Sequence, residues 1–334
     1  MTGAAPLLFL SDADTARLLA WPDVIACLAA AYGRPADPAA TPPRTVARLD
    51  GAWLRAMAAM SPSRRVAGAK VISRSRAKRV SYLIALWDQE TSELVCLLDG
   101  RTVTAMRTAG TSAVAVDRML PPGPVRLAVL GSGHEAGTHV SAMAAVRPVE
   151  SLTVFSPTPA NRERFAQRFA AELGVPCTAA ATAREAVAGA TLVVAAARSH
   201  DETAILEGAW LVPGQVVVSI GSTVPEQREV DPEVIRRAEV IVADVPEEVA
   251  GETGDMIAAH AAGVDFAAKI VPLADLVQGK AGGRQRAGGI TLFKSVGAGL
   301  QDIAVSEMCY EKALRDGVGT RLAAGLAVKG GKKG

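Results

Sequence analysis

A chain of 334 residues, 49% of them hydrophobic, is long enough for about two domains or one large one, with ample material for a sizeable core. Its 36 lysines and arginines nearly balance its 34 aspartates and glutamates, so the net charge of +2 gives no overall field to attract nucleic acid or an anionic membrane. The 4 cysteines and 4 histidines are scattered singly, and we therefore expect no metal site.

The N-terminus shows neither the basic start nor the apolar run of a signal peptide. No apolar stretch of the sequence reaches the roughly 18 residues of a membrane span. A cytoplasmic protein is therefore expected, with a small molecule as its partner and neither nucleic acid nor a membrane.

The first 118 residues mix helix-like and strand-like patterns. A helical pattern runs from Asp12 to Tyr32, and a proline-rich link from Pro35 to Pro43 follows it. The runs "VAGAKVIS" and "SYLIALWD" predict strands, and the turn "QETSE" joins the second run to "LVCLLDG" as a hairpin. The proline-rich "MLPPGPVR" then marks the expected domain boundary, between residues 118 and 119.

Beyond this boundary, short apolar runs alternate with helical segments. The runs are "VRLAVL", "SLTVF", "ATLVVAA", "GQVVVSI" and "AEVIVADV". Continuous apolar runs of this length are typical of a parallel sheet that helices cover on both faces. A final helical segment, from Asp302 to about Ala324, is expected to pack back on the first domain.

The predicted fold class is therefore α/β. A doubly wound, Rossmann-type domain with a parallel sheet is expected over residues 119–302, where it would bind a dinucleotide. A second domain, of the α+β kind, is expected over residues 1–118 together with 303–330.

The segment "LAVLGSGHEAG" places a glycine-rich turn between a predicted strand and a predicted helix. This context puts a pyrophosphate against backbone N–H groups at a helix N-terminus, whereas the same glycines in a plain tight turn would bind nothing. The expected cofactor contacts in this turn are Gly131, Ser132, Gly133, His134, Glu135 and Ala136.

The next predicted strand ends without a carboxylate before Glu163. In a Rossmann-type fold, an acidic residue at this point binds the free ribose 2′-hydroxyl of NAD. This segment instead offers Ser156, Thr158, Asn161 and Arg162 as cofactor contacts, with Arg162 or Arg164 to meet a 2′-phosphate. NADP(H) is therefore expected in preference to NAD(H), although Thr158 before a proline is also a good helix N-cap.

An arginine and a threonine stand among small residues in "LLDGRTVTAMRTAG". Ala105, Ala109 and Gly110 allow close backbone packing, which would let Arg107 and Thr108 approach two different anions. The alternative is that Arg107 lies on a solvated helix face. A guanidinium can hold a planar carboxylate through two parallel hydrogen bonds, which fix its orientation as well as its location.

The sequence resembles the ornithine cyclodeaminase/mu-crystallin family from about residue 42 to residue 302. The matching segments are "PPRTVARL", "VAGAKVIS", "LLDGRTVTAMRTAGTSA", "GSGHEAGTHV", "SIGSTVPEQREVD" and "ITLFKSVGAGLQD". The resemblance implies that the first domain and the C-terminal helix bind a small amino-acid-like substrate and form a homodimer.

The resemblance also implies roles for single residues. The family's substrate-carboxylate arginines match Arg44 and Arg107, its active-site lysine matches Lys70, and Thr108 matches a contact to the cofactor phosphate. Strand alternation would either turn Lys70 to solvent or leave it desolvated beside the arginines, where a lowered pKa suits proton transfer. Catalytic roles are expected for Lys70 and Arg107, and further cofactor contacts for Ser222, Lys294 and Ser295.

One position departs from the family's cyclodeaminases, which carry an acid/base aspartate shortly after the glycine of the segment "IGSTVPE". The matching residue here is Thr223, and a threonine hydroxyl cannot act as a carboxylate base near neutral pH. Nearby, Asp231 opens the helical segment "DPEVIRRAE" and is expected to be its N-cap, so neither it nor Glu229 receives a catalytic role.

The expected activity is that of an NADPH-dependent reductase, which converts a small C=N substrate with an α-carboxylate into an amino acid. The substrate would be a cyclic ketimine or the imine of a 2-oxo acid. Arg44 and Arg107 would hold its carboxylate, and Lys70 would supply or relay a proton. The alternatives are amination of a 2-oxo acid in the manner of alanine dehydrogenase, ornithine or lysine cyclodeamination, which Thr223 disfavours, and a non-catalytic protein of the crystallin kind that binds NADPH and a ligand.

Overall fold

A computed structural model describes residues 7–35, 37–197, 199, 201, 203–281, 289–323, 326, 328 and 329. The chain forms two compact units, one made of Met1–Thr108 with Ala298–Gly334 and the other of Ala109–Gly297. We call the first the mixed-sheet unit and the second the parallel-sheet unit. Their boundaries lie at 108/109 and 297/298, whereas the sequence analysis places them at 118/119 and 302/303; helix α3 (Gly100–Met119) continues unbroken through the first boundary.

The mixed-sheet unit contains a sheet with the strand order β15-β1-β6-β5-β4-β3-β2. Its neighbouring strands are antiparallel except β1 and β6, which are parallel. Its elements besides the start of α3 are β1 (Leu7–Leu10), α1 (Asp12–Leu18), α2 (Trp21–Tyr32), β2 (Thr45–Leu49), β3 (Ala52–Met60), β4 (Val66–Arg74), β5 (Val80–Asp88), β6 (Leu94–Asp99), α11 (Gly299–Asp316) and β15 (Thr320–Leu322).

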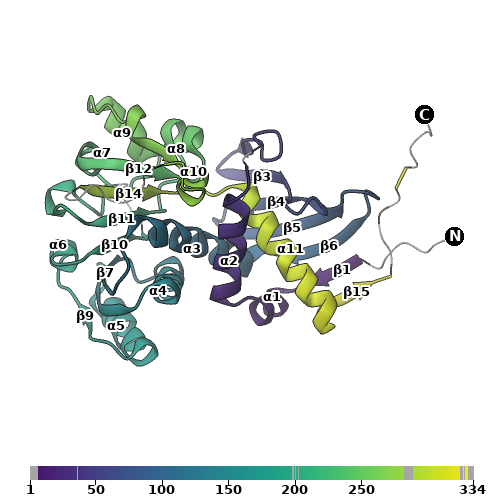
Figure 1. The fold of residues 1–334 in the computed structure, drawn as a ribbon, viewed down its shortest axis with the longest axis horizontal. Helices are drawn as coiled ribbons and strands as arrows, with labels where there is room; N and C mark the ends of the chain where they lie inside the picture. Colours follow the sequence, from purple (N-terminus) through teal and green to yellow (C-terminus); the bar gives the residue numbers. More distant parts are fainter. Residues whose placement is uncertain are drawn as a thin grey trace. The chain divides into compact units, whose positions relative to one another are not determined.

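One face of this sheet is buried under α11, which packs against β3, β4 and β5, while α1 and α2 pack on α11 (Figure 1). Every second residue of Val66–Ile72 is buried on this side. Two glycines allow the helix to come this close: a Cβ on Gly68 would lie 2.5 Å from Ile303 Cδ1, and one on Gly299 would lie 2.5 Å from the carbonyl oxygen of Ala58.

The opposite face of the same sheet is apolar and more exposed. Strand alternation places Leu54, Met60 and Leu83 on this side, and they are 48%, 44% and 45% exposed. The positions between them on β3 and β4 include several alanines, so few polar groups interrupt the surface.

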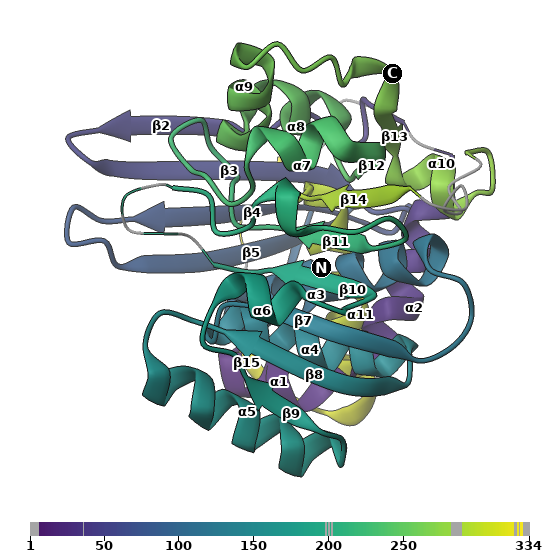
Figure 2. The same ribbon diagram turned by 90° about the vertical axis from the view of Figure 1, so that its left-hand side faces the viewer.

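The parallel-sheet unit contains a sheet in the order β13-β12-β14-β11-β10-β7-β8-β9, and all its described strand pairs are parallel (Figure 2). The order reverses direction between β7 and β10, as in a doubly wound fold. Besides the end of α3, its elements are β7 (Val125–Leu130), α4 (His134–Val146), β8 (Val149–Phe155), α5 (Pro159–Leu173), β9 (Cys177–Ala179), α6 (Ala183–Val187), β10 (Leu192–Ala195), η1 (Gly208–Trp210), β11 (Val216–Ser219), α7 (Pro232–Arg237), β12 (Ala238–Ala243), α8 (Pro246–Glu252), α9 (Gly254–Ala261), η2 (Ala267–Lys269), β13 (Ile270–Pro272), α10 (Leu273–Val277) and β14 (Ile290–Lys294).

Both faces of this parallel sheet are buried, as its continuous apolar runs predict. On one face, Leu130, Val193 and Val217 pack in a core with residues of α6, α7 and α9. On the other face, Val129 and Val218 are fully buried as well. The prediction of an α/β fold with a doubly wound parallel sheet is confirmed.

Two predicted elements have different limits in the structure. The helical pattern of Asp12 to Tyr32 forms two helices, because Pro22 stands in the first turn of α2 and cannot continue a preceding helix. The predicted helix from Asp302 to about Ala324 is also too long, because α11 ends at Asp316 and Gly317 follows in a left-handed conformation with φ +66°.

Within the described part of the chain, no helix is long and apolar enough to cross a membrane. The cysteines Cys27, Cys96, Cys177 and Cys309 are free. Among the residues described, no group of three or more His, Cys, Asp and Glu side chains is placed to hold a metal ion.

Candidate active site

Two buried cations of the mixed-sheet unit converge on one carboxylate. Lys70 extends from β4, Arg107 from α3 and Asp302 from the first turn of α11. Lys70 Nζ lies 2.7 Å from both carboxylate oxygens of Asp302, and Arg107 Nε donates to Oδ1 at 2.9 Å. Lys70 and Asp302 are 0% exposed and Arg107 is 6% exposed. We call these three residues the cationic cluster.

The alternation along β4 turns Lys70 inward, beneath α11, and not to solvent. Its cross-strand neighbours are the apolar residues Met57 of β3 and Ile84 of β5. The pKa of Lys70 is lowered from 10.5 to about 7, chiefly by burial and also by the positive charges of Arg107 and Arg55, while Asp302 opposes this change. A lysine with a pKa near 7 can both give and take a proton around neutral pH.

Polar side chains fix Arg107 from a second side. Its Nη1 donates to Gln301 Oε1 at 2.8 Å, and Gln301 Nε2 donates to the hydroxyl oxygen of Tyr32 at 2.8 Å. All three side chains are buried. The guanidinium is therefore held in one plane by two residues of α11, which favours recognition of a planar partner.

Arg44, the third predicted cation, lies just before β2 and is half-buried. Within β2, Val46 pairs with Arg55 of β3. Arg55 in turn pairs with Ile72, two residues along β4 from Lys70. Arg55 is therefore on the sheet face that carries the cationic cluster, and Arg44 directly precedes the first residue of β2.

Three residues around the cationic cluster have no role predicted from the sequence: Asp302, Gln301 and Arg55. The first two belong to the segment "ITLFKSVGAGLQD", which carries part of the family resemblance. The motif therefore pointed to these positions, but it does not reveal that the carboxylate of Asp302 pairs with Lys70 and Arg107. Arg55 interrupts an apolar strand in "AWLRAMAAM". A charged residue at a core-facing strand position is the pattern that would have found it.

The glycine turn of the parallel-sheet unit has the geometry that a pyrophosphate requires. Gly131 has φ +126°, its N–H donates to the Phe155 oxygen at 2.8 Å, and an added Cβ would lie 2.8 Å from the Ala196 oxygen. Gly133 is the N-cap of α4 and has no side chain to cap the first helical turn. The N–H groups of such a turn attract an anion, so these residues fit a dinucleotide.

The rest of the predicted turn opens α4. His134 and Glu135 stand in its first turn, with His134 exposed and Glu135 half-buried, and Ala136 is fully buried. The small side chain of Ala136 suits a position where helix and strand pack closely.

The predicted 2′-phosphate contacts gather at the carboxyl end of β8, beside the glycine turn. Ser132 Oγ donates to Ser156 Oγ at 2.9 Å, and Arg162 Nη1 donates to the Ser156 carbonyl oxygen at 3.0 Å. Thr158 is the N-cap residue of α5, although its hydroxyl makes no capping bond among the described contacts, and Asn161 follows in the first turn. Both interpretations of Thr158 therefore stay open.

Thr108, the predicted phosphate contact on α3, is half-buried and adjacent to Arg107 in sequence. Its hydroxyl donates to the Thr104 carbonyl oxygen at 2.7 Å. A phosphate accepts hydrogen bonds, so this hydroxyl must leave the helix carbonyl to bind one.

The other three predicted cofactor contacts make internal hydrogen bonds of the parallel-sheet unit. Ser222 Oγ donates to the Gln227 carbonyl oxygen at 2.7 Å. Ser295 Oγ donates to Asp244 Oδ2 at 2.6 Å. Lys294, 0% exposed, donates to Ser219 Oγ and Asp255 as described below. All three side chains are buried and hydrogen-bonded within the unit. Their contact with a cofactor stays a prediction.

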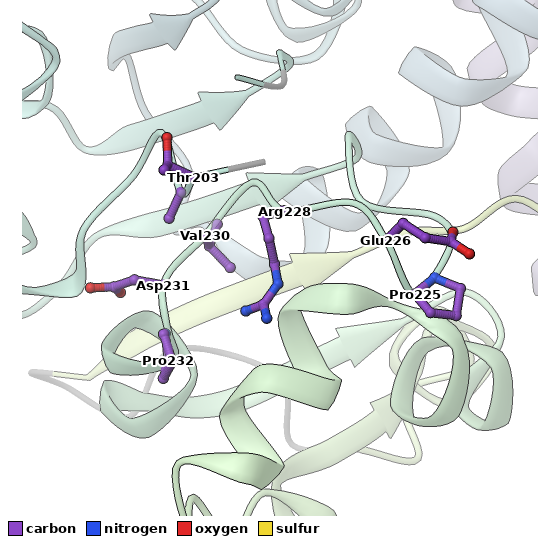
Figure 3. A pocket seen from close by; sticks show the side chains of 8 residues that line it. Thr203, Pro225, Glu226, Arg228, Val230, Asp231 and Pro232 are labelled. Carbon is purple, nitrogen blue, oxygen red and sulfur yellow. The ribbon is translucent and has the colours of Figure 1, made fainter. Parts of the chain in front are cut away.

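A cavity of about 570 Å³ lies among the loops that follow β10 and β11 (Figure 3). Its lining contains none of the predicted site residues and consists of Thr203, Ala204, Pro225, Glu226, Arg228, Val230, Asp231 and Pro232. Asp231 accepts from the Val234 N–H at 3.0 Å, which confirms it as the N-cap of α7. On the same loop, Thr223 donates from its N–H to Gln227 Oε1 at 2.9 Å.

The fold and its motifs agree with one protein family. The parallel-sheet unit is a Rossmann-type domain with its glycine turn after β7. The chain belongs to the ornithine cyclodeaminase/mu-crystallin family, whose model matches residues 8–317. The family resemblance predicted from the sequence is confirmed.

The relatives include named reductases. Delta(1)-pyrroline-2-carboxylate reductase of Bacillus cereus is 30% identical over 246 residues, which are 73% of this chain and 75% of that protein. Ketimine reductase mu-crystallin of Mus musculus is 29% identical over 228 residues, 68% of each chain. The structure of Thermococcus litoralis Delta(1)-pyrroline-2-carboxylate reductase in complex with NADH and L-proline has a TM-score of 0.87 and 29% identity, and the match covers 95% of this chain and 100% of that one.

Proposed function

We propose that the protein is a nicotinamide-dependent oxidoreductase that reduces a small C=N substrate with an α-carboxylate to an amino acid. The observation that carries this proposal is the cationic cluster, in which Lys70 and Arg107 share the single carboxylate of Asp302. Two buried cations on one anion attract a further anion, and an α-carboxylate supplies it. The names of the relatives, a pyrroline-2-carboxylate reductase and a ketimine reductase, support the same class of substrate.

The chain's own residues have distinct roles in this reaction. Arg107, fixed by Asp302 and Gln301, binds the substrate carboxylate, and Arg44, just before β2, is a second arginine for the same carboxylate. Lys70 supplies or relays a proton to the imine nitrogen, because its pKa of about 7 lets it donate near neutral pH. Orientation of the substrate by the arginines contributes to the rate by holding the imine carbon in a reactive position.

The cofactor is held by the parallel-sheet unit. Reduced nicotinamide, when bound, supplies the hydride that the reaction needs. Gly131 and Gly133 would hold the pyrophosphate at the N-terminus of α4, and Ser156 and Arg162 would hold the ribose and its 2′-phosphate. We propose a preference for NADPH over NADH, because the carboxyl end of β8 offers an arginine and hydroxyls where an NAD-binding domain has an acid.

The protein is further proposed to act as a homodimer. The apolar sheet face around Leu54, Met60 and Leu83 is the surface that a second copy would cover, since exposed apolar patches of this kind mark association sites. Light scattering of the purified protein is expected to give twice the monomer mass. A mass of one chain at micromolar concentration would contradict the dimer and leave the proposed reaction untouched.

The test of the activity follows the absorbance of the reduced nicotinamide. NADPH and NADH are each combined with a pyrroline or piperideine 2-carboxylate, with 2-oxo acids plus ammonia or amines, and with ornithine. Oxidation of NADPH by the cyclic imines is expected. Oxidation only with a 2-oxo acid and ammonia would favour amination of the alanine dehydrogenase kind, and cofactor binding without any turnover would favour a binding protein. Ammonia release from ornithine would overturn the proposal and the argument from Thr223.

A further inference from the structure

A buried carboxylate outside the cationic cluster accepts hydrogen bonds from two backbone segments at the carboxyl ends of β10 and β11. Glu229 is 0% exposed. Its Oε2 accepts from Ser219 Oγ at 2.5 Å and from the Gly221 N–H at 2.8 Å, and its Oε1 accepts from the Ala197 N–H at 3.3 Å. Gly221 approaches so closely that a Cβ on it would lie 2.4 Å from Glu229 Oε1.

A buried ion pair between Lys294 and Asp255 is connected to this carboxylate by hydrogen bonds. Lys294 Nζ donates to Ser219 Oγ at 2.8 Å and to Asp255 Oδ2 at 2.7 Å. Asp255 Oδ1 accepts from the N–H groups of Glu229 and Val230 at 2.8 and 3.2 Å. The side chains of Glu229, Ser219, Lys294 and Asp255 thus form one continuous hydrogen-bonded group, which we call the buried polar network.

The network lies where a dinucleotide-binding sheet places its second nucleotide. Ala197 follows β10, Gly221 follows β11 and Lys294 ends β14. All three strands lie beyond the point between β7 and β10 at which the strand order reverses. Dinucleotides bind across the carboxyl ends of the strands at this point, with one nucleotide on each half of the sheet. Because β8 and Arg162, which lies in the first turn of the following helix α5, belong to the adenosine half, the β10–β11 half is left for the nicotinamide nucleoside.

The charge of Glu229 depends on pH near neutrality. Its pKa is raised from 4.5 to about 7, chiefly by burial and also by the negative charge of Asp255, while Lys294 and the hydrogen bonds from Ser219 and Gly221 oppose the rise. The ionised carboxylate accepts three hydrogen bonds, whereas the protonated acid must donate one. The backbone segments at Ala197 and Gly221 are therefore held best by the ionised form.

We propose that Glu229 is a positioning residue that fixes the backbone of Ala197 and Gly221 and thereby shapes the binding site of the nicotinamide nucleoside. This inference rests on the proposed function, because it needs a nicotinamide nucleotide on the parallel-sheet unit. It also gives Lys294 a different role from the predicted one: its ammonium group acts on the cofactor through Ser219 and Asp255.

Glu229→Gln tests this role with nearly the same shape. The glutamine amide has a single oxygen, so the amide nitrogen must face either the Ala197 N–H or the Ser219 and Gly221 donors. One of the two segments then loses its acceptor and moves. Glu307→Gln is the matched control, because Glu307 is a buried carboxylate of the mixed-sheet unit that accepts from Ser61 and Ser63.

The experiment measures binding of NADPH and of 2′,5′-ADP, which lacks the nicotinamide half, by titration calorimetry from pH 6 to pH 9. Glu229→Gln is expected to weaken NADPH binding about tenfold, the effect of about 1.4 kcal/mol, at pH 8 and to leave the affinity for 2′,5′-ADP unchanged. The difference between the wild-type and variant NADPH affinities is expected to shrink as the pH falls through 7, because protonation disables Glu229 in the wild type. Glu307→Gln is expected to bind both ligands as the wild type does.

The outcomes separate this inference from the proposed function. Equal NADPH affinity in Glu229→Gln and the wild type, or equal losses for both ligands, would overturn the positioning role and leave the reductase proposal standing. A wild-type protein that binds 2′,5′-ADP and NADPH equally well would also overturn it. Failure of the wild type to bind any nicotinamide nucleotide would overturn the proposed function itself. If Glu229→Gln does not fold, Ser219→Ala, which removes one hydrogen bond of the network, must show the same selective loss at smaller size.

Discussion

Each of the two units buries a lysine–aspartate ion pair, and the two pairs differ in the sign of the third charged group beside them. Lys70 lies 2.7 Å from Asp302 in the mixed-sheet unit, and Lys294 lies 2.7 Å from Asp255 in the parallel-sheet unit, all four side chains being 0% exposed. The first pair is joined by a second cation, Arg107. The second pair is joined, through Ser219, by a second carboxylate, Glu229.

This difference shows what each group is built to do. The cationic cluster has two positive side chains for one negative one, which suits a group that binds an anionic substrate. The buried polar network directs its surplus carboxylate at the N–H groups of Ala197 and Gly221, so its charge is satisfied by the protein's own backbone. A buried lysine–aspartate pair alone therefore does not indicate a substrate site. The sign of the third charged group determines whether such a pair suits an anionic ligand.

The largest expected effect comes from Lys70→Met, which keeps the volume and removes the proton. Arg107 still pairs with Asp302, so the variant is expected to fold. Its kcat with a cyclic imine is expected to fall by about 10²–10⁴, the usual contribution of a proton donor. Lys78→Met, at an exposed position of the turn after β4, is the control and is expected to retain full activity. A kcat within about twofold of the wild type would remove Lys70 from the chemistry.

Lys294→Met contrasts the two lysines in stability. It leaves Asp255 and Glu229 without their cation, so the free energy of unfolding is expected to fall by about 3–5 kcal/mol. Lys70→Met leaves Asp302 paired with Arg107 and is expected to cost clearly less. Urea unfolding of both variants measures the difference, and equal losses would show that the third charge does not distinguish the groups.

The pH dependence of stability is expected to run in opposite directions for the two groups. The pKa of Lys70 is lowered to about 7, so between pH 7 and 10.5 the unfolded chain binds its proton and the native chain does not, and the free energy of unfolding rises with pH. The pKa of Glu229 is raised to about 7, so from pH 4.5 to 7 the native chain binds the extra proton and stability falls as pH rises.

Each of these contributions is at most about 1.4 kcal/mol per pH unit, the limit for a single proton. Urea unfolding across pH 5 to 10 measures them. Lys70→Met is expected to lose the rise above pH 7, and Glu229→Gln the fall below it. Variants whose slopes match the wild type in these windows would show that the two groups do not titrate as the burial implies.

A smaller effect is expected at the carboxyl end of β8. Arg162→Ala is expected to raise the KM for NADPH about five- to tenfold, roughly 1–1.4 kcal/mol, and to change the KM for NADH little, because a half-buried phosphate contact contributes modestly. Arg168→Ala, at an exposed position further along α5, is the control. Equal effects of Arg162→Ala on the two cofactors would remove the basis for an NADP preference.

Most of the fold could be predicted because its signals are local. The apolar runs that became β7, β8, β10, β11 and β12 are continuous, and the turn between β5 and β6 is a short polar segment. The limits of helices were harder. A propensity pattern carries across Leu19 and Ala20, where the structure breaks the helix before Pro22, and beyond Gly317, where β15 pairs with β1.

The candidate site could be predicted only in part, since motifs name residues but not their partners. Lys70, Arg107 and Asp302 all stand in segments shared with the family, but no motif shows that Asp302 meets Lys70 from 232 positions away, a distance that only the tertiary fold closes. Glu229 received no role because no pattern in "VPEQREVD" reveals that its side chain is fully buried. The neighbouring Asp231 was predicted correctly as a helix N-cap, because that signal is local. Burial determines which charged partners Asp302 and Glu229 have, and burial results from the packing of distant segments.

The most direct test of the central claim, that the cationic cluster binds the substrate carboxylate, is Arg107→Ala beside Arg101→Ala, an exposed arginine earlier on α3. The KM for a cyclic imine carboxylate and the dissociation constant of NADPH are measured for both. Arg107→Ala is expected to raise the imine KM at least about 30-fold, from the loss of about 2 kcal/mol, with NADPH affinity nearly unchanged, while Arg101→Ala changes neither. Equal losses of imine and NADPH affinity in Arg107→Ala would contradict the account.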